Sequence, residues 1–525
     1  MTRLLRVVTT FHSGRLLAGL LFTAIFSLAA VPPLDPDLWW HLANGRLLSF
    51  PVSFPHTDLY SFTATGHVWV MHEWLSDLMM YGLFTLGGLP LLVVVFAAIV
   101  TAGGVVLYLL LRRAGLHPTA SVALTLMGIL AGSTAWGARP QVLNVLFTAA
   151  LVLGLQAYQT GRLRAWWLSP FLWLWANLHS AFLVGVIITA LFLFGEMIDS
   201  WRTGAAPVPP RLRALALALL AGIGLSVINP YGIETLLFPL GTLTSPLIQN
   251  NIQEWASPDF HTLPGQLLEA LIFIVILGLA TGRVRARTSE WLWALALLYL
   301  ALSSQRQVPL FVLAAAPLIG RCGQAVIGWL GDLHDLRAPC LTVPQAGSDM
   351  RERVAFRWSP QSFGGTRSSP VLGFVNLAIL LVVGAGMIAY RAFPSVEPAH
   401  QAAAIAATFP VKTTDAVQRL GLGSSLRVFN YYDYGGYLLW RLNPSGGRVF
   451  IDGRVEVYGP QVFRDYLSIN YSSNDWRTLL VRYDPNVILL PKGHPLVDVL
   501  RRDQSWYELA EDSVSVAFRA TGMAQ

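Results

Sequence analysis

Long apolar runs separated by short polar segments dominate the first three quarters of the chain. A membrane-spanning helix needs about 20 apolar residues, and somewhat fewer suffice inside a bundle. This pattern predicts about eleven spans, near residues 14–31, 88–111, 119–136, 140–158, 165–178, 180–198, 212–228, 265–281, 289–303, 307–329 and 371–391. We therefore expect a mainly α-helical, polytopic transmembrane bundle over residues 1–391. We expect its first span to be uncleaved, with a cleaved signal peptide as the alternative.

Three segments depart from this pattern. Residues 73–84 have helical periodicity but are short and carry Asp77, so we predict an amphipathic helix lying in the outer interface, within one external loop over 32–87. Residues 330–370 are basic and contain Gly, Ser and Pro, which is typical of a mobile cytoplasmic loop. Residues 392–525 have a different composition and predict a small extracytoplasmic α/β domain.

Within this C-terminal domain, helical pieces and short β-rich runs alternate with turn signals. We predict helices at 402–409 and 414–420, and strands at 426–429, 437–442, 448–451, 487–490 and 513–519.

Composition and charge fix the class of protein and its orientation. Only 12% of residues are charged and 54% are hydrophobic, whereas soluble domains carry about 25% charged residues. The net charge of +7 does not indicate nucleic-acid binding, because the arginines mostly lie in short loops between apolar runs. These loops fall on one side of the predicted bundle, which the positive-inside rule makes cytoplasmic. The C-terminal domain then lies outside, and we expect the inner (plasma) membrane of a bacterium.

Polar residues collect at the opposite, outer ends of the predicted spans. Ionisable residues at membrane depth are functional candidates, and a one-sided collection predicts a single cavity that opens outward. Its predicted members are Asp35, Asp37, His41, His72, Glu73, Arg139, His179 and Arg306.

Structural roles compete with functional ones for several of these residues. Asp35 and Asp37 can cap the helix that follows them, but two carboxylates exceed what one cap needs, so we favour function. His179 fits a tight turn as well as a binding site. Trp39 and Trp40 are interpreted as anchors in the membrane interface.

The residue types indicate group transfer from a lipid phosphate. A carboxylate can deprotonate or orient an acceptor hydroxyl or amide, and the pair Asp35 and Asp37 could also hold Mg²⁺ or Mn²⁺. Arg139 and Arg306 could mark loop ends, but arginines bind phosphate oxygens bidentately, and positive charge is otherwise scarce on this side. No organic cofactor is expected.

The layout resembles that of GT-C membrane glycosyltransferases, which include oligosaccharyltransferase catalytic subunits, protein O-mannosyltransferases and the aminoarabinose transferase of lipid A. The likeness rests on an acidic motif directly after the first span, followed by an interfacial helix. In that fold an acidic residue of the first loop is catalytic or binds metal, which implies this role for Asp35 or Asp37.

A second resemblance lies in the C-terminal domain. Tyr431–Gly435 is similar to the Trp-Trp-Asp-Tyr-Gly motif with which oligosaccharyltransferases read their acceptor sequon, although tyrosines replace both tryptophans. The resemblance implies acceptor binding by Tyr432 and Asp433, whereas the residues alone equally fit a packing cluster. Asp452 and Arg454 are secondary candidates for substrate binding, or members of a solvated strand face.

These observations together predict a glycosyltransferase that uses a polyprenyl-phosphate-linked sugar. The expected partners are this donor, membrane lipids and a glycan, lipid or protein acceptor. Two other classes stay open. A transporter or flippase of lipid-linked substrates would favour inverted repeats and broken helices, and neither is evident. A non-catalytic subunit of a membrane complex would keep the fold without turnover.

Overall fold

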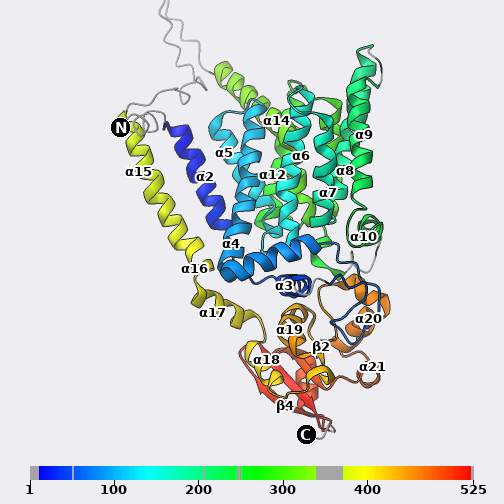
Figure 1. Ribbon diagram of the computed structural model, residues 1–525. Coiled ribbons are helices and arrows are strands. Elements are labelled where there is room, and N and C mark those ends of the chain that lie inside the picture. The colour runs from blue at the N-terminus through cyan, green and yellow to red at the C-terminus, as the bar shows by residue number, and fades with distance from the viewer. Residues whose placement is uncertain are drawn as a thin grey trace, which may run out of the picture.

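A computed structural model shows two parts, a helical bundle and a C-terminal region that lies against one end of it (Figure 1). The structure describes residues 11–521 except 50–52, 205, 207, 244, 246–248, 250 and 338–369. Most of the predicted basic loop over 330–370 is therefore outside the described residues. We call the end of the bundle that faces the C-terminal region the sheet-facing end.

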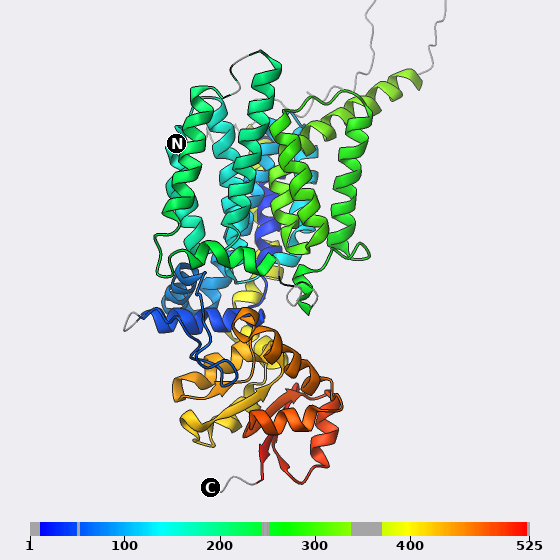
Figure 2. The same ribbon diagram turned by 90° about the vertical axis from the view of Figure 1, so that its right-hand side faces the viewer.

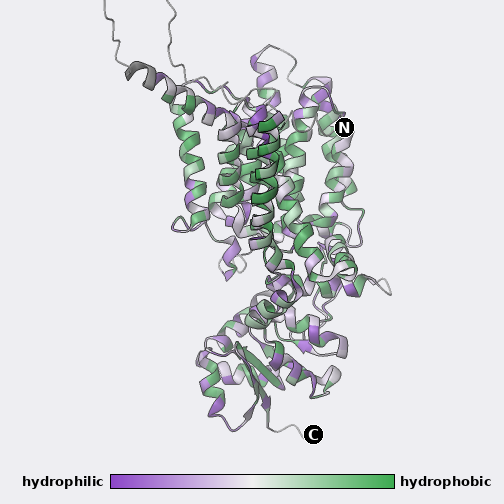
Figure 3. Cartoon of the chain, turned by 90° about the vertical axis from the view of Figure 1, so that its left-hand side faces the viewer, coloured by the Kyte–Doolittle hydropathy of each residue, from purple (hydrophilic) through white to green (hydrophobic). Residues whose placement is uncertain are grey.

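Each of the eleven segments predicted to cross the membrane coincides with a helix. The bundle consists of α2 (Ser13–Ala29), α4 (Trp74–Arg113), α5 (Pro118–Ala131), α6 (Leu143–Gln159), α7 (Leu168–Leu178), α8 (Phe182–Arg202), α9 (Pro210–Leu225), α12 (Leu263–Ala280), α13 (Thr288–Ser303), α14 (Val308–Arg337) and α15 (Pro370–Met387). Of the described helices, six are long and apolar enough to cross a membrane and three more are apolar but shorter. The chain is thus an integral membrane protein, while the count of eleven spans stays a prediction. Hydrophobic residues line the middle of the bundle, and hydrophilic ones gather at its ends (Figure 3).

The sheet-facing end is closed by α3 (Pro36–Ser49) and by the first part of α4, which both lie across the ends of the other helices (Figures 1 and 2). The helix α4 is broken at Gly87 and Gly88, where the backbone leaves helical geometry. Gly88 has φ +65° and ψ −161°, a conformation that only glycine adopts readily. The break separates the predicted interfacial helix from the span that follows it.

The C-terminal region is built on a mixed five-stranded sheet of order β2-β1-β3-β5-β4. Strands β1 (Arg427–Asn430), β2 (Arg448–Val449) and β3 (Val487–Pro491) are parallel, and β5 (Ser515–Ala520) and β4 (Trp506–Glu511) extend the sheet antiparallel. Apolar strand residues such as Phe429, Ile488 and Phe518 are fully buried. Its helices are α16 (Phe393–Val396), α17 (Pro398–Thr408), α18 (Val411–Gln418), α19 (Gly435–Leu442), α20 (Val455–Asn470), α21 (Trp476–Tyr483) and α22 (Pro495–Arg501).

The strand predicted at 437–442 is wrong, because this segment forms the helix α19. Its first two residues, Gly435 and Gly436, allow close packing: a Cβ at Gly435 would lie 2.2 Å from the carbonyl oxygen of Ile451, and one at Gly436 would lie 2.4 Å from that of Pro36. The helix therefore docks directly on the start of α3.

Trp39 and Trp40 are buried, which corrects their interpretation as interface anchors. The Trp39 ring packs edge-on against Phe409 and Tyr437 at centroid distances of 5.6 and 5.2 Å. These contacts join α3 to the C-terminal region.

Residues 32–87, which the sequence predicts to form one external loop and which keep that name below, also join the C-terminal sheet. Ser61 pairs with Val449 of β2 in a parallel bridge, and the backbone amide of Val449 donates to the carbonyl of Tyr60 at 3.2 Å. The loop thereby covers the β2 edge and fixes the C-terminal region over the sheet-facing end.

Candidate functional site

A cavity of about 670 Å³ lies between the sheet-facing end and the C-terminal region. The structure brings eleven of the twelve predicted site residues to its wall; the exception is Asp452. Those eleven come from α3, the external loop, the segments that precede η2 (Pro140–Val142) and α8, the 3₁₀ turn η5 (Gln305–Gln307), the 3₁₀ turn η9 (Tyr432–Tyr434) and the segment before α20. Segments more than 400 residues apart in sequence therefore share one site.

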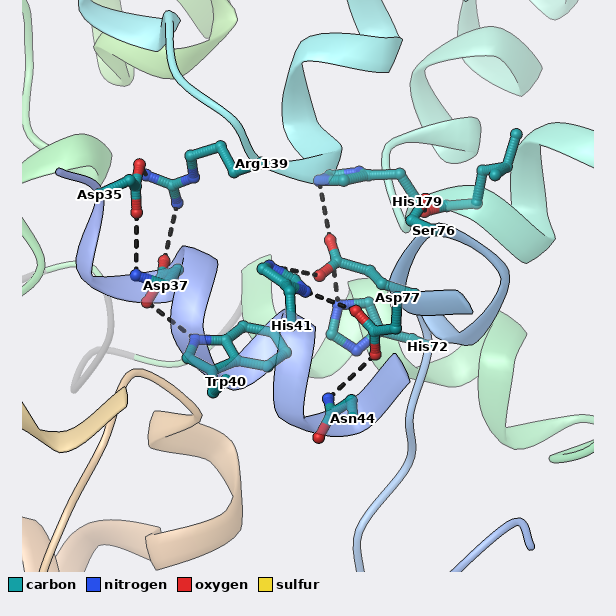
Figure 4. A network of polar contacts seen from close by, with 12 residues as sticks. Asp35, Asp37, Trp40, His41, Asn44, His72, Ser76, Asp77, Arg139 and His179 are labelled. Carbon is teal, nitrogen blue, oxygen red and sulfur yellow. Dashed lines mark hydrogen bonds and ion pairs between the residues drawn. The ribbon is translucent and has the colours of Figure 1, made fainter. Parts of the chain in front are cut away.

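At one wall of the cavity, Arg139 contacts the carboxylates of Asp35 and Asp37 (Figure 4) and also that of Glu254. Its Nη1 donates to Asp35 Oδ2 at 3.1 Å and its Nη2 to Asp37 Oδ2 at 3.0 Å, and both nitrogens contact the carboxylate of Glu254. Glu254 lies on the 3₁₀ turn η4 (Gln253–Trp255). Burial lowers the pKa of Arg139, but the carboxylates of Asp35 and Asp37 outweigh it and raise this pKa on balance.

The two aspartates differ in their second hydrogen bond. Asp35 Oδ1 accepts the backbone N–H of Asp37 at 2.9 Å, so Asp35 also caps α3. Asp37 Oδ1 accepts the indole N–H of Trp40 at 2.9 Å. Burial raises the pKa of the Asp37 carboxyl, although Arg139 pulls it down. Its side chain is 25% exposed against 14% for Asp35, so Asp37 is the more accessible base.

A second cluster surrounds Glu73 with three histidines, which are His41, His72 and His179 in Figure 4. The Nε2 atoms of His179, His72 and His41 lie 3.1, 3.6 and 3.7 Å from its carboxylate oxygens. His41 also contacts Asp77 through Nδ1 at 2.5 Å, and Asp77 accepts a hydrogen bond from Asn44 at 2.9 Å.

The proton of His179 can be placed from its partners. Its Nδ1 accepts the backbone N–H of Ala181 at 2.9 Å, so the neutral ring carries its proton on Nε2, which faces Glu73. Burial lowers the pKa of His179 to about 3, so the ring is neutral near pH 7. Burial also disfavours the charged form of His72, but Glu73 outweighs it and raises the pKa of His72.

Arg306 lines the cavity from η5. Its guanidinium stacks over the Trp255 ring, 5.0 Å from the centroid. Among the described residues, no carboxylate lies within 4.0 Å of it, whereas Arg139 has three such partners. Arg306 is therefore the better placed of the two arginines to receive an anionic ligand.

The C-terminal wall carries aromatic rings and carboxylates. Tyr432 donates its backbone N–H to the hydroxyl of Tyr466 at 2.9 Å, while the side chains of Asp433 and Glu456 are exposed at the cavity. The protein around the cavity limits the hydration of these two carboxyls, and this desolvation raises the pKa of both.

Asp452 and Arg454 form a different kind of site. They are 0% and 1% exposed. The Nε and Nη2 of Arg454 donate hydrogen bonds to the two carboxylate oxygens of Asp452 at 2.9 and 2.7 Å. Its Nη1 reaches Asp58 of the external loop at 2.9 Å, and the rings of Tyr60 and Trp69 lie 4.9 and 4.5 Å from its carbon Cζ. This cluster fastens the loop to the sheet.

Sequence reasoning missed Asp77, Asn44, Glu254 and Glu456. Glu73, the N-cap residue of α4, and Asp77 are four residues apart, and His41 and Asn44 are three residues apart on α3. This spacing was a usable signal. Glu254 had no such signal, because its partner Arg139 is 115 residues away.

The metal ion predicted at Asp35 and Asp37 does not fit this arrangement. The Arg139 guanidinium lies between both carboxylates, and in the part of the chain that the structure describes no group of three His, Cys, Asp or Glu side chains is arranged to hold a metal.

Comparison with known proteins supports the fold. No protein-family model and no curated protein matches the chain. The archaeal oligosaccharyltransferase AglB from Archaeoglobus fulgidus, solved with an inhibitory peptide and a dolichol-phosphate, is similar in structure: the match has 11% identity and a TM-score of 0.51, and covers 91% of this chain and 69% of that chain. ArnT from Cupriavidus metallidurans in the apo state matches with 15% identity and a TM-score of 0.48, over 94% of this chain and 95% of that chain. The resemblance in fold that the sequence predicted is thus confirmed, because the chain has the fold found in AglB.

Proposed function

We propose that the chain is a membrane glycosyltransferase that transfers a sugar from a polyprenyl-phosphate donor to an acceptor bound in the cavity. The observation that carries this proposal is the pairing, in one cavity, of an arginine without a carboxylate partner in the described chain, Arg306, with a carboxylate of raised pKa, Asp37. Arg306 can bind the phosphate of the donor, and Asp37 can remove a proton from the acceptor.

The donor phosphate is assigned to Arg306. A guanidinium binds phosphate oxygens through two parallel hydrogen bonds and keeps its charge at every accessible pH. The apolar side chains of Leu183, Val184 and Ile187 on α8 line the same cavity, which supports a lipid chain leaving the phosphate toward the bundle.

Asp37 is assigned as the general base. The acceptor O–H or N–H gives its proton to the Asp37 carboxylate as the acceptor atom bonds to C1 of the sugar. The bond between C1 and the phosphate oxygen breaks, and the polyprenyl phosphate leaves with the electron pair, held by Arg306. One displacement of this kind inverts the configuration at C1.

The side of the membrane follows from the arginines. Arg112, Arg113 and Arg202 end the helices α4 and α8 at the bundle end opposite the cavity. The positive-inside rule then puts the cavity and the C-terminal region outside the cytoplasm. This supports a donor that has already been moved across the membrane, in a bacterial cell envelope.

Binding and transfer by purified protein in lipid nanodiscs test the proposal. With a panel of synthetic polyprenyl-phosphate sugars, we expect one donor class to bind. Asp37→Asn should keep donor binding and slow transfer about 10²–10⁴-fold, the usual contribution of a general base, and Arg306→Ala should weaken donor binding. The exposed Asp475→Asn and Arg464→Ala are the matched controls. If folded protein binds no donor and purifies with stoichiometric partners, it is a structural subunit instead.

A further inference from the structure

Every oxygen of the three carboxylates around Arg139 already accepts a hydrogen bond from the protein. Asp35 uses Oδ1 for the amide of Asp37 and Oδ2 for Arg139. Asp37 uses Oδ1 for Trp40 and Oδ2 for Arg139. Both Glu254 oxygens contact the guanidinium. All six carboxylate oxygens therefore accept a hydrogen bond.

A divalent cation at this place would have to displace Arg139. Mg²⁺ and Mn²⁺ draw carboxylate oxygens to about 2.0–2.2 Å and require several of them on one centre. The guanidinium is instead planar and its charge is delocalised. Its Nη1 contacts Asp35 and its Nη2 contacts Asp37. The side chains of all three acids and of Arg139 are at most 27% exposed, so the charges are poorly screened and need this partner.

We propose that Arg139 is a built-in cation that takes the place of a divalent metal ion at the first-loop carboxylates. Its task is positioning: it holds Asp37 with Oδ2 toward the guanidinium and offsets part of the negative charge of three acids. Reaction at Asp37 then proceeds without added metal. The role of Arg139 in catalysis rests on the proposed function, whereas the prediction that wild-type protein binds no divalent metal here does not.

The closing experiment measures Mn²⁺ binding by electron paramagnetic resonance on metal-stripped, full-length protein, independently of any donor. The wild type should show no saturable Mn²⁺ site. Arg139→Ala leaves three carboxylates without their cation, so a saturable site should appear, and it should vanish again in the double variant Arg139→Ala, Asp37→Ala. Arg464→Ala, an exposed arginine, should behave like the wild type.

A second measurement follows sugar transfer, with the donor class that binds in the panel of polyprenyl-phosphate sugars. Transfer by the wild type should be unchanged by EDTA, and Arg139→Ala should lose transfer while Arg139→Lys, which keeps the charge but not the fork, retains part of it. Mn²⁺ binding by the wild type that depends on Asp37, or a folded Arg139→Ala that gains no Mn²⁺ site, would overturn the proposal. If no donor is turned over, the proposed function fails while the Mn²⁺ measurement still decides the role of Arg139.

Discussion

Glu73 lies at the sheet-facing end among three histidines that come from three different segments, and their protonation differs. Glu73 is 8% exposed. Burial raises the pKa of its carboxyl, but the nearby histidines, His72 first, outweigh it and hold this pKa well below its usual range. The Nε2 of neutral His179 lies 3.1 Å from a Glu73 oxygen, and Glu73 raises the pKa of His72, which favours the charged form of that ring. The carboxylate is therefore a fixed charge that orients the ring beside it.

His41 makes stability depend on pH. Burial lowers the pKa of His41, but the Asp77 carboxylate 2.5 Å away outweighs it, and the pKa is raised above its ordinary value near 6.5. A raised folded-state pKa stabilises the protein fully below about pH 6.5, and this stabilisation is lost as pH rises through the folded pKa. We expect the thermal midpoint in detergent to fall over that range.

His41→Gln removes a charged hydrogen bond and should lower the free energy of unfolding at pH 6 by about 1.5–3 kcal/mol. The thermal midpoint at pH 6 should fall accordingly, and its decrease toward higher pH should become smaller. The exposed His261→Gln is the control. An unchanged pH profile in His41→Gln would show that another group, such as His72, carries the effect.

Arg454 contributes to stability through the external loop. Replacing it by lysine keeps one charge but cannot reach Asp452 and Asp58 together. Breaking such a buried pair costs about 3–5 kcal/mol. We expect Arg454→Lys to lower the thermal midpoint and to expose residues 53–70 to limited proteolysis, unlike Arg464→Lys at an exposed position. Loss of transfer with unchanged stability and proteolysis would instead give Arg454 a role in substrate binding.

At the scale of elements, the approach of the C-terminal region to α3 depends on Gly453. A Cβ there would lie 2.1 Å from Asp37 Oδ1 and 2.9 Å from Trp40 Nε1. Overpacking of this kind costs about 1–3 kcal/mol. We expect Gly453→Ala to move the Asp37 carboxylate and slow transfer more than it lowers stability, measured as turnover and thermal midpoint.

Gly493→Ala is the matched control for this substitution, because a Cβ at Gly493 meets nothing within 4 Å. Equal effects of both substitutions on turnover would contradict a role for the contact between Gly453 and Asp37.

The elements of the bundle were predictable, whereas those of the C-terminal region were only partly so. Apolar runs of sufficient length have few alternatives to a helix in a membrane. Residues 437–442 are instead a short run of mostly aromatic and aliphatic side chains, which predicts a strand. They form a helix whose first residues, Gly435 and Gly436, make close contacts with neighbouring backbone. The secondary structure of this segment therefore depends on tertiary packing, which its local sequence does not predict.

At the scale of the whole molecule, the sequence predicted which residues would meet but not how they pair. Polar residues at the same ends of successive helices must converge, which brought Asp37, Arg139 and Arg306 into one cavity. The pairing of Arg139 with Glu254, or of Arg454 with Asp58 across 396 residues, depends on side-chain geometry that no spacing encodes. For that reason the sequence left a metal ion possible at Asp35 and Asp37, where Arg139 lies.

Orientation in the membrane is the remaining property of the whole molecule that the chemistry requires, because a lipid-linked donor and its acceptor must meet on one side. The arginines predict that the C-terminal region is outside. In a variant with Cys322→Ser and Cys340→Ser, single cysteines at two exposed positions, Ser473→Cys in the C-terminal region and Thr203→Cys after α8, test this. A membrane-impermeant maleimide should label Ser473→Cys in intact cells and Thr203→Cys only after permeabilisation. The reverse result would put the cavity in the cytoplasm, where the donor would be used on the side of its synthesis and no prior transfer across the membrane would be needed.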